Sequence, residues 1–92
     1  MNATPTAAEL PQWEQRDREL RKTYKLRNFK AAIAFVNSVA DIAEDAGHHP
    51  DIDIRWNRVT LTLSTHSAGA LTNLDFEVAK RIEDRYATDH SG

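Results

Sequence analysis

The sequence contains no cysteine, and this absence excludes several classes of protein. Disulfide-linked folds, thiolate zinc sites and enzymes with a cysteine nucleophile all require a thiol that the chain lacks. Glycine is also scarce, with three residues in 92, so no glycine-rich loop is available to cradle a phosphate group. We therefore expect no phosphate-binding loop.

Long apolar runs and blocks of one charge are missing as well. No stretch is long enough to span a membrane, and the N-terminus lacks the basic segment and apolar run of a secretory signal. The 12 basic and 14 acidic residues are mixed along the chain, which gives a net charge of -2 without a concentrated basic patch. We expect a cytoplasmic protein with no direct nucleic-acid partner and no membrane partner.

The patterned part of the sequence has the length of one domain. Residues 1–10 have no periodicity and several turn formers, which predicts a flexible N-terminal tail. Residues 11–87 are predicted to form the single domain, and the polar residues 88–92 a frayed C-terminal tail. A chain this short buries a limited core, so oligomerisation would be a further source of stability.

The first half of the domain predicts a hairpin followed by a helix. Residues 13–16 and 19–26 are the two strands, since apolar and charged residues alternate along the second segment. The helix is predicted between Asn28, which can cap its first turn, and Gly47, which can adopt the left-handed conformation that ends a helix. Its expected buried face repeats at three and four residues: Phe29, Ala32, Ile33, Val36, Val39, Ala40 and Ala43.

The second half repeats this order. After Pro50 the period changes to two, which predicts a second hairpin with its turn at Asn57–Arg58. A second helix is predicted to start at Thr72, where Asp75 completes an acidic variant of the capping box. Its expected apolar face consists of Leu74, Val78, Ile82 and Tyr86. The order ββαββα predicts an α+β fold, a four-stranded antiparallel sheet with two helices packed on one face.

Three of the four histidines fall at two points of this layout. His48 and His49 directly follow the first helix, and His66 lies at the end of the fourth strand. Pairing within the second hairpin places the start of its first strand beside the end of its second, so these histidines should share one cleft. Histidine can give or take a proton near neutral pH, so the cluster suggests proton-transfer catalysis, a metal site, or both.

Structural roles compete with the catalytic interpretation. A histidine after a helix can satisfy terminal carbonyl groups, Asp75 can simply cap the second helix, and Trp56 can belong to the core rather than stack on a flat ligand. A zinc site is disfavoured because consecutive histidines on a strand point to opposite faces. Glu44, one turn before His48, would favour its imidazolium form, whereas burial would oppose it.

The chain resembles the pterin-4a-carbinolamine dehydratases in a spaced set of residues: Glu44, His48-His49-Pro50, Trp56, Thr65-His66, Gly69, Leu71-Thr72 and Asp75. The resemblance extends upstream to Trp13 and to the helical segment 29–35, so it covers nearly the whole domain. Two positions depart from the family's pattern. Ala70 stands where the family often has a second glycine, and Ser67 where many members have an acidic residue.

The resemblance implies a dehydratase that converts 4a-hydroxytetrahydropterin to quinonoid dihydropterin and water, in tetrahydrobiopterin recycling. It implies no metal, no organic cofactor, and assembly as a homodimer or homotetramer. The family's substrate-binding segments fall on His48, His49, Pro50, Thr65, His66, Ser67 and Ala68. The candidate catalytic residues are His48, His49 and His66, and the supporting residues are Glu44, Trp56 and Asp75.

Among the three histidines, we expect His48 and His66 to act as acid and base and His49 mainly to orient the pterin. The resemblance also allows a function of another class. Family members serve as non-catalytic partners that stabilise another protein's oligomer, including the dimer of a transcription factor. Retention of all three histidines favours the enzyme, because a pure scaffold has no chemical need for them.

Overall fold

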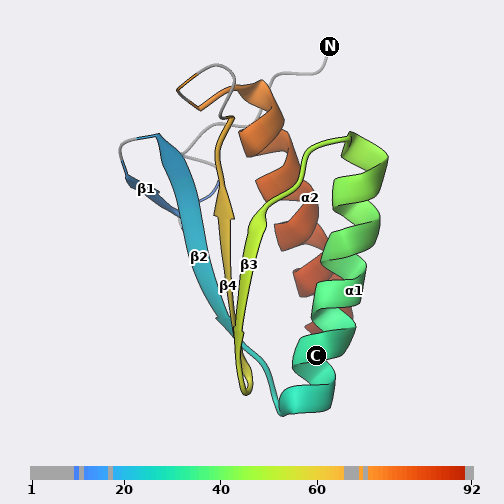
Figure 1. Ribbon diagram of the computed structural model, residues 1–92. Helices are drawn as coiled ribbons and strands as arrows, with labels where there is room; N and C mark the ends of the chain where they lie inside the picture. The colour runs from blue at the N-terminus through green and yellow to red at the C-terminus, as the bar shows by residue number, and fades with distance from the viewer. Residues whose placement is uncertain (1–9, 11, 17, 66–68, 70, 91–92) are drawn as a thin grey trace.

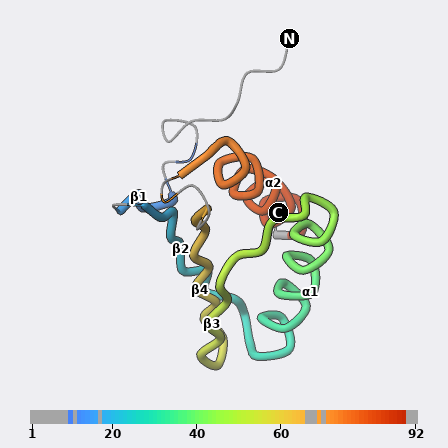
Figure 2. Tube along the Cα trace, turned by 45° about the horizontal axis from the view of Figure 1, so that its top comes forward, coloured from blue at the N-terminus to red at the C-terminus, as the bar shows by residue number. Residues whose placement is uncertain are grey.

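The computed structural model describes residues 10, 12–16, 18–65, 69 and 71–90 (Figure 1). Its elements are β1 (Glu14–Arg16), β2 (Glu19–Lys25), α1 (Phe29–Ala46), β3 (Asp51–Arg55), β4 (Arg58–Leu63) and α2 (Asn73–His90). The strands form one antiparallel sheet in the order β1-β2-β4-β3. Both helices lie on the same side of this sheet (Figure 2). The α+β fold and the ββαββα order are confirmed.

The sheet register places the two ends of the β3–β4 hairpin as the sequence predicts. Asp51 at the start of β3 pairs with Thr62 near the end of β4, and Arg55 pairs with Arg58 across the turn. The segment that follows α1 therefore lies beside the chain that leaves β4. Within the described residues, β3 is an edge strand with β4 as its only neighbour.

The hydrophobic core lies between the sheet and the helices. β2 and β4 supply alternate buried residues, and an aromatic cluster joins the layers, with the ring centroid of Tyr24 4.6 Å from Phe35 and 4.8 Å from Tyr86. Leu10, which we placed in the N-terminal tail, is 1% exposed and belongs to this core. Its carbonyl accepts a hydrogen bond from the N–H of Trp13 at 3.0 Å.

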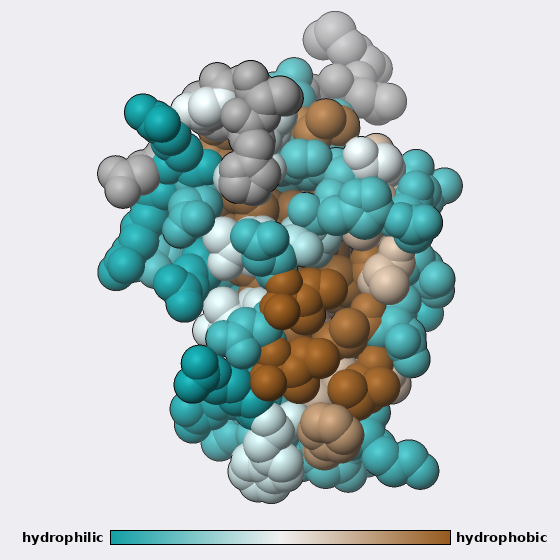
Figure 3. Space-filling view, viewed as in Figure 1, coloured by the Kyte–Doolittle hydropathy of each residue, from teal (hydrophilic) through white to brown (hydrophobic). Residues whose placement is uncertain are grey.

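The buried face of α1 is rotated from the predicted one. Phe35 and Ile42 are buried, whereas Phe29 and Ala40 are exposed. The sequence carries two overlapping stripes at the spacing of three and four, and periodicity alone does not distinguish them. The stripe that faces both the sheet and α2 became the core. The second stripe, which includes Phe29, stays exposed. Together with β3 it contributes to the apolar surface that Figure 3 shows over β3 and α1.

The turn of the second hairpin lies one residue earlier than predicted, at Trp56–Asn57. Asn57 is buried: its Nδ2 donates to the carbonyl of Leu26 at 3.0 Å, and its own carbonyl accepts from the N–H of Leu26 at 2.7 Å. These bonds fix Asn57 in the turn. Trp56 consequently adopts a positive φ of 54° and is 70% exposed, so its predicted place in the strand and its core alternative are both wrong.

The helix ends follow the predicted capping chemistry. Asn28 Oδ1 accepts the N–H of Ala31 at 2.8 Å, and Gly47 ends α1 in the left-handed conformation with φ 65°. In α2, Leu74 is 43% exposed rather than on the buried face. The helix continues to His90, beyond the predicted end of the domain at residue 87. No helix of the described residues combines the length and apolar character needed to cross a membrane.

Lys22 interrupts the apolar alternation of β2, and α2 accounts for it. Its Nζ forms an ion pair with Glu83 and lies 4.1 Å from the ring centroid of Tyr24. The Tyr24 hydroxyl donates to the same Glu83 oxygen at 2.5 Å. The ammonium group of Lys22 therefore lies in a part-buried cluster with Tyr24 and Glu83, and each of these three polar groups has a partner.

Candidate active site

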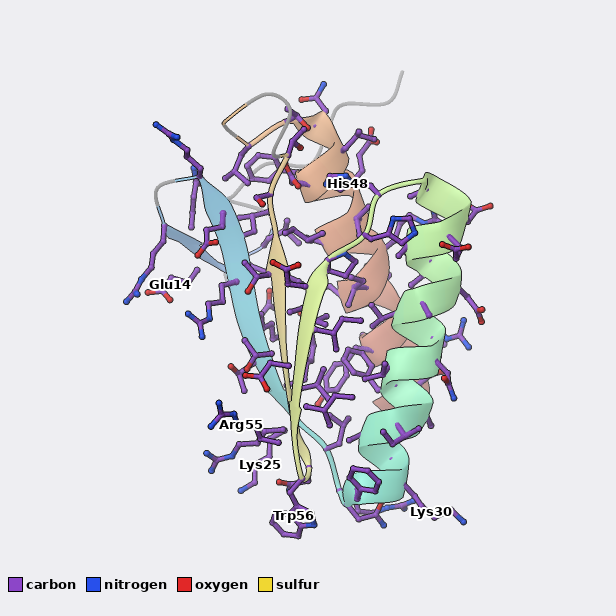
Figure 4. The ribbon with its side chains drawn as sticks, in the orientation of Figure 1. Glu14, Lys25, Lys30, His48, Arg55 and Trp56 are labelled. Atoms are coloured by element: carbon purple, nitrogen blue, oxygen red, sulfur yellow. The ribbon has the colours of Figure 1, made fainter. Side chains whose placement is uncertain are left out.

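His48 is fixed in position by the end of α1. Its backbone N–H donates to the carbonyl of Ala43 at 3.1 Å, in the turn that Gly47 closes. The imidazole is 13% exposed, and Nε2 lies 2.6 Å from Oδ1 of Asp75 in the first turn of α2. Figure 4 shows His48 near the C-terminal end of α1 and the start of α2. Two segments that are distant in sequence thus meet at this histidine–carboxylate pair.

Asp75 is the centre of the site, because its carboxylate is fully buried and accepts three hydrogen bonds. Oδ1 accepts from His48, while Oδ2 accepts from the Thr65 hydroxyl at 2.7 Å and from the Thr72 N–H at 2.9 Å. The bond to Thr72 is the acidic capping-box contact that the sequence predicts. Asp75 therefore caps α2 and orients His48 at the same time.

The hydrogen-bond network sets the direction of each proton. An ionised carboxylate only accepts, so His48 donates through Nε2–H and Thr65 through its hydroxyl. Thr65 has a single hydroxyl proton, so the 2.8 Å contact between the two threonine hydroxyls runs from Thr72 to Thr65. His48 then keeps Nδ1 for another partner, and Nδ1 makes no hydrogen bond to a described residue. The network presents one defined imidazole nitrogen to a ligand.

His49 belongs to a separate and exposed pair. Its Nε2 lies 2.5 Å from Glu44 Oε2, with the two side chains 61% and 77% exposed. Glu44 was expected to favour the imidazolium form of His48, one turn later, whereas in the structure its carboxylate bonds to His49. The loop after Gly47 turns the two consecutive histidines to different partners: His48 contacts buried Asp75 and His49 contacts solvent-exposed Glu44. Both side chains of this pair are exposed to solvent, unlike the buried carboxylate of Asp75.

Pro50 is half-buried and directly precedes β3, and the other predicted site residues divide into three groups. His66, Ser67 and Ala68 lie outside the described residues, so their predicted roles stay predictions. Thr65 is described, and its hydroxyl proton is committed to Asp75. Trp56 lies at the end of the β3–β4 hairpin, at the opposite end of the protein from His48 (Figure 4), so the structure does not bring it into the site of its own chain.

Thr72 belongs to the site, although the sequence reasoning did not count it among the candidate site residues. We placed it in the family-like pattern and at the start of α2 without giving it a role, yet it contacts both Asp75 and Thr65. Its position three residues before a candidate aspartate was the available signal. Among the described residues, no group of three or more histidine, aspartate or glutamate side chains is arranged to hold a metal ion.

The fold and the buried pair define a small α+β protein with a histidine–carboxylate site at one end of its sheet. The chain belongs to the pterin 4 alpha carbinolamine dehydratase family, whose model matches residues 2–85. A relative from Roseiflexus castenholzii is 57% identical over 76 residues, which cover 83% of this chain and 82% of the relative. One from Chloroflexus aurantiacus is 56% identical over 77 residues, covering 84% and 83%. Both carry the provisional name of pterin-4-alpha-carbinolamine dehydratase.

Solved structures agree with this assignment of the fold. A transcriptional coactivator/pterin dehydratase from Brucella melitensis matches with a TM-score of 0.76 and 27% identity, covering 89% of this chain and 97% of that one. A pterin dehydratase-like protein described as a RuBisCO assembly factor of the alpha-carboxysome matches with a TM-score of 0.65 and 22% identity, covering 78% and 83%. The second likeness supports the fold alone.

Proposed function

We propose that this protein dehydrates 4a-hydroxytetrahydropterin to quinonoid dihydropterin and water by histidine acid/base catalysis, as a step in tetrahydrobiopterin recycling. The observation that carries the proposal is the buried His48–Asp75 pair, which leaves one imidazole nitrogen available beside a fixed carboxylate. Membership of the dehydratase family supports the choice of a pterin. We also expect the protein to work in the cytoplasm, without a metal or organic cofactor.

The reaction needs two proton transfers. The bond between C4a and the hydroxyl oxygen breaks, and that oxygen takes up a proton and leaves as water. The N–H bond at N5 also breaks, its electron pair forms the C4a=N5 double bond, and its proton goes to a base. An appropriately placed acid or base contributes about 10²–10⁴-fold to such a step.

His48 suits the role of the base at N5. With Nε2–H donated to Asp75, neutral His48 accepts a proton at Nδ1, and the resulting imidazolium lies against a carboxylate. In this assignment His66 is the acid that protonates the leaving hydroxyl group. His49 lies on the exposed side of the site with Glu44, which suits binding and orientation of the pterin.

The test is a direct assay with chemically generated 4a-hydroxytetrahydropterin. The double variant His48→Ala/His66→Ala should lose the accelerated dehydration while it retains the fold, as judged by circular dichroism. His90→Ala is the matched control, because His90 is the one histidine without a proposed role. Wild-type rates in the double variant would refute the assignment.

A non-catalytic role as an oligomer-stabilising partner is the alternative. The description of the Brucella melitensis neighbour as a coactivator/pterin dehydratase is the observation that keeps it open. A scaffold would show no turnover in the direct assay and would copurify with one stoichiometric protein partner. Turnover that depends on His48 would exclude a purely structural role.

A further inference from the structure

Three cations stand in a row across the end of the sheet that carries the β3–β4 turn. Lys25 of β2 pairs with Arg58 of β4, and Arg58 pairs in turn with Arg55 of β3. Side chains of directly opposed residues project from the same face of a sheet. The neighbouring pair, Tyr24 and Val59, points into the core, so the three cations lie on the face that the helices leave uncovered.

Little negative charge balances this row. The Nε atom of Arg55 lies 3.4 Å from Asp53 in an exposed contact, whereas Lys25 and Arg58 form no ion pair with a described residue. Like charges that stand directly opposite each other destabilise a sheet. The fold therefore carries a repulsion that an anionic ligand would relieve.

A second basic segment lies against the same turn. The buried side chain and the carbonyl of Asn57 both bond to the backbone of Leu26, which fixes the turn beside the residues that lead into α1. Arg27 and Lys30 belong to this segment, and both are exposed. The first turn of α1 holds no acidic residue, and the N-terminus of a helix carries partial positive charge. The helix start thus adds to the positive potential at the turn.

The pairing of β2 with β4 creates this basic end from segments that are distant in sequence. Residues 25–30 and 54–60 together contain five of the 12 basic residues and none of the 14 acidic ones. Along the chain the two segments are separated by the whole of α1 and most of β3. The mixed charge of the sequence therefore conceals a concentrated positive surface at one end of the fold.

An exposed indole lies among these cations. Trp56 borders a hollow of about 440 Å³ together with Lys25, Arg55, Asn57 and Arg58, and this volume is within the range of small-molecule sites. The indole is 70% exposed, and its residue has a φ of 54°, which suits glycine and is an outlier for a bulky side chain. Backbone strain of this kind is concentrated at ligand sites.

We propose that this hollow, the basic-turn pocket, binds a nucleoside di- or triphosphate, with the base stacked on Trp56 and the phosphates held by the row of Lys25, Arg55 and Arg58. Figure 4 shows Trp56, Lys25 and Arg55 at the opposite end of the protein from His48. The pocket is therefore separate from the candidate active site, and the proposal does not rest on the proposed function.

A nucleotide uses both chemical features of the pocket. The indole offers a flat face on which any base can stack. The planar guanidinium groups of Arg55 and Arg58 can each form paired hydrogen bonds with phosphate oxygens, and Lys25 adds a point charge. An aliphatic anion would leave the indole unused, and a neutral flat ligand would leave the cations unbalanced.

The extent of the positive surface favours a small ligand over a nucleic-acid strand. On the same face of the sheet, the next two rows away from the turn contain Asp53 and then Asp51. These carboxylates and Glu19 border the adjoining hollow. A strand that followed the sheet would meet them, because its phosphates track a continuous basic groove. A free nucleotide needs only the end of the sheet.

Calorimetric titration with ATP, in EDTA to exclude metal ions, tests the pocket without an assay of dehydration. Arg58→Gln removes one cation of the row and should raise the dissociation constant about tenfold or more. Trp56→Gly removes the stacking face and should raise it about tenfold, while glycine suits the positive φ and preserves the turn. Arg21→Gln is the matched control, because Arg21 is an exposed arginine two rows away on the same face. The control should bind ATP as the wild type does.

Tripolyphosphate and an oligothymidylate distinguish the parts of the proposal. Tripolyphosphate has the charges without the base, so it should bind more weakly than ATP and respond to Arg58→Gln but not to Trp56→Gly. No saturable binding of ATP to the wild type at millimolar concentrations, or equal weakening in Arg21→Gln and Arg58→Gln, would overturn the pocket. Tripolyphosphate that binds as tightly as ATP would overturn the stacking on Trp56. Tighter binding of the oligothymidylate than of ATP would overturn the free nucleotide and assign this end to single-stranded nucleic acid.

Discussion

His48 and Asp75 lie 27 residues apart in the chain, yet Nε2 of the histidine and Oδ1 of the aspartate are 2.6 Å apart. The aspartate is fully buried and the histidine nearly so. Breaking such a pair by removing one partner leaves a buried polar group unsatisfied, which is more costly than the loss of an exposed ion pair. The pair therefore links the stability of the α2 N-terminus to the orientation of a candidate catalytic base.

Asp75→Asn should separate the effect of Asp75 on the stability of the α2 N-terminus from its effect on the orientation of His48. The amide oxygen still accepts from Thr72 and Thr65, but the amide nitrogen is a donor and faces the Nε2–H of His48. We expect dehydration to slow by about 10²-fold or more, because the imidazole loses its fixed tautomer and its carboxylate. The free energy of unfolding should change less than in Asp75→Ala, which leaves several donors unpaired. Steady-state kinetics and urea unfolding measure the two effects, and an unchanged rate in Asp75→Asn would contradict the role of the pair.

Thr65→Val tests the hydrogen bond that the Thr65 hydroxyl donates to Oδ2 of Asp75. The substitution removes the hydroxyl that donates to Asp75 and accepts from Thr72, while it preserves the β-branched shape. We expect a loss of about 1–3 kcal/mol in the free energy of unfolding, because part-buried partners lose a hydrogen bond. Thr23→Val is the matched control, since the Thr23 hydroxyl bonds Thr60 at 2.8 Å on the exposed face. Equal losses of unfolding free energy in Thr65→Val and Thr23→Val would contradict a larger contribution of the Asp75 network to stability.

The exposed Glu44–His49 pair should behave differently from the buried pair. Glu44→Gln is expected to change the free energy of unfolding by about 0–1 kcal/mol, because solvent screens both groups. His49→Asn should raise KM for the pterin more than it lowers kcat, as expected of a residue that binds and orients. A fall in kcat as large as that of a His48 variant would instead place His49 in the proton transfer.

Tyr24 should make the stability of the protein sensitive to high pH. Burial, together with the hydrogen bond to Glu83, raises the pKa of the Tyr24 hydroxyl far above its ordinary value of 10.0. The folded state then keeps this proton where the unfolded state loses it. The stabilisation is complete below about pH 10 and declines as the pH rises further. Urea unfolding between pH 9 and about pH 11 should show this decline in wild type and a weaker one in Tyr24→Phe. The same decline in both proteins would contradict the assignment.

The sequence predicted the elements well where local chemistry and periodicity agree. Asn28 and Gly47 mark the ends of α1 because their capping conformations are local properties. The buried face of α1 was predicted incorrectly because two sets of apolar residues share the same helical spacing. The set with Phe35 and Ile42 is buried, whereas Phe29 and Ala40 of the other set are exposed. Only packing against the sheet and α2 decides between the two stripes.

The sequence indicated some of the residues that meet at the candidate site, such as His48 and Asp75, but not how the side chains pair. The register of the β3–β4 hairpin brought the segment after α1 beside the end of β4, as expected. Glu44 was assigned to His48, whereas the loop geometry pairs it with His49. Thr72 was overlooked because its contact with Thr65 depends on how the start of α2 meets the end of β4. Side-chain partners across a loop follow from tertiary geometry, which spacing does not encode.

Chemical rescue of His48→Ala tests the central claim most directly. Decay of 4a-hydroxytetrahydropterin is followed by stopped-flow absorbance with the wild type, with His48→Ala, and with His48→Ala plus imidazole. We predict that the substitution slows dehydration by about 10²–10⁴-fold and that imidazole restores part of the rate, since it supplies the missing base beside Asp75. Dehydration by His48→Ala at the wild-type rate, or a loss that imidazole does not restore, would contradict proton transfer by His48.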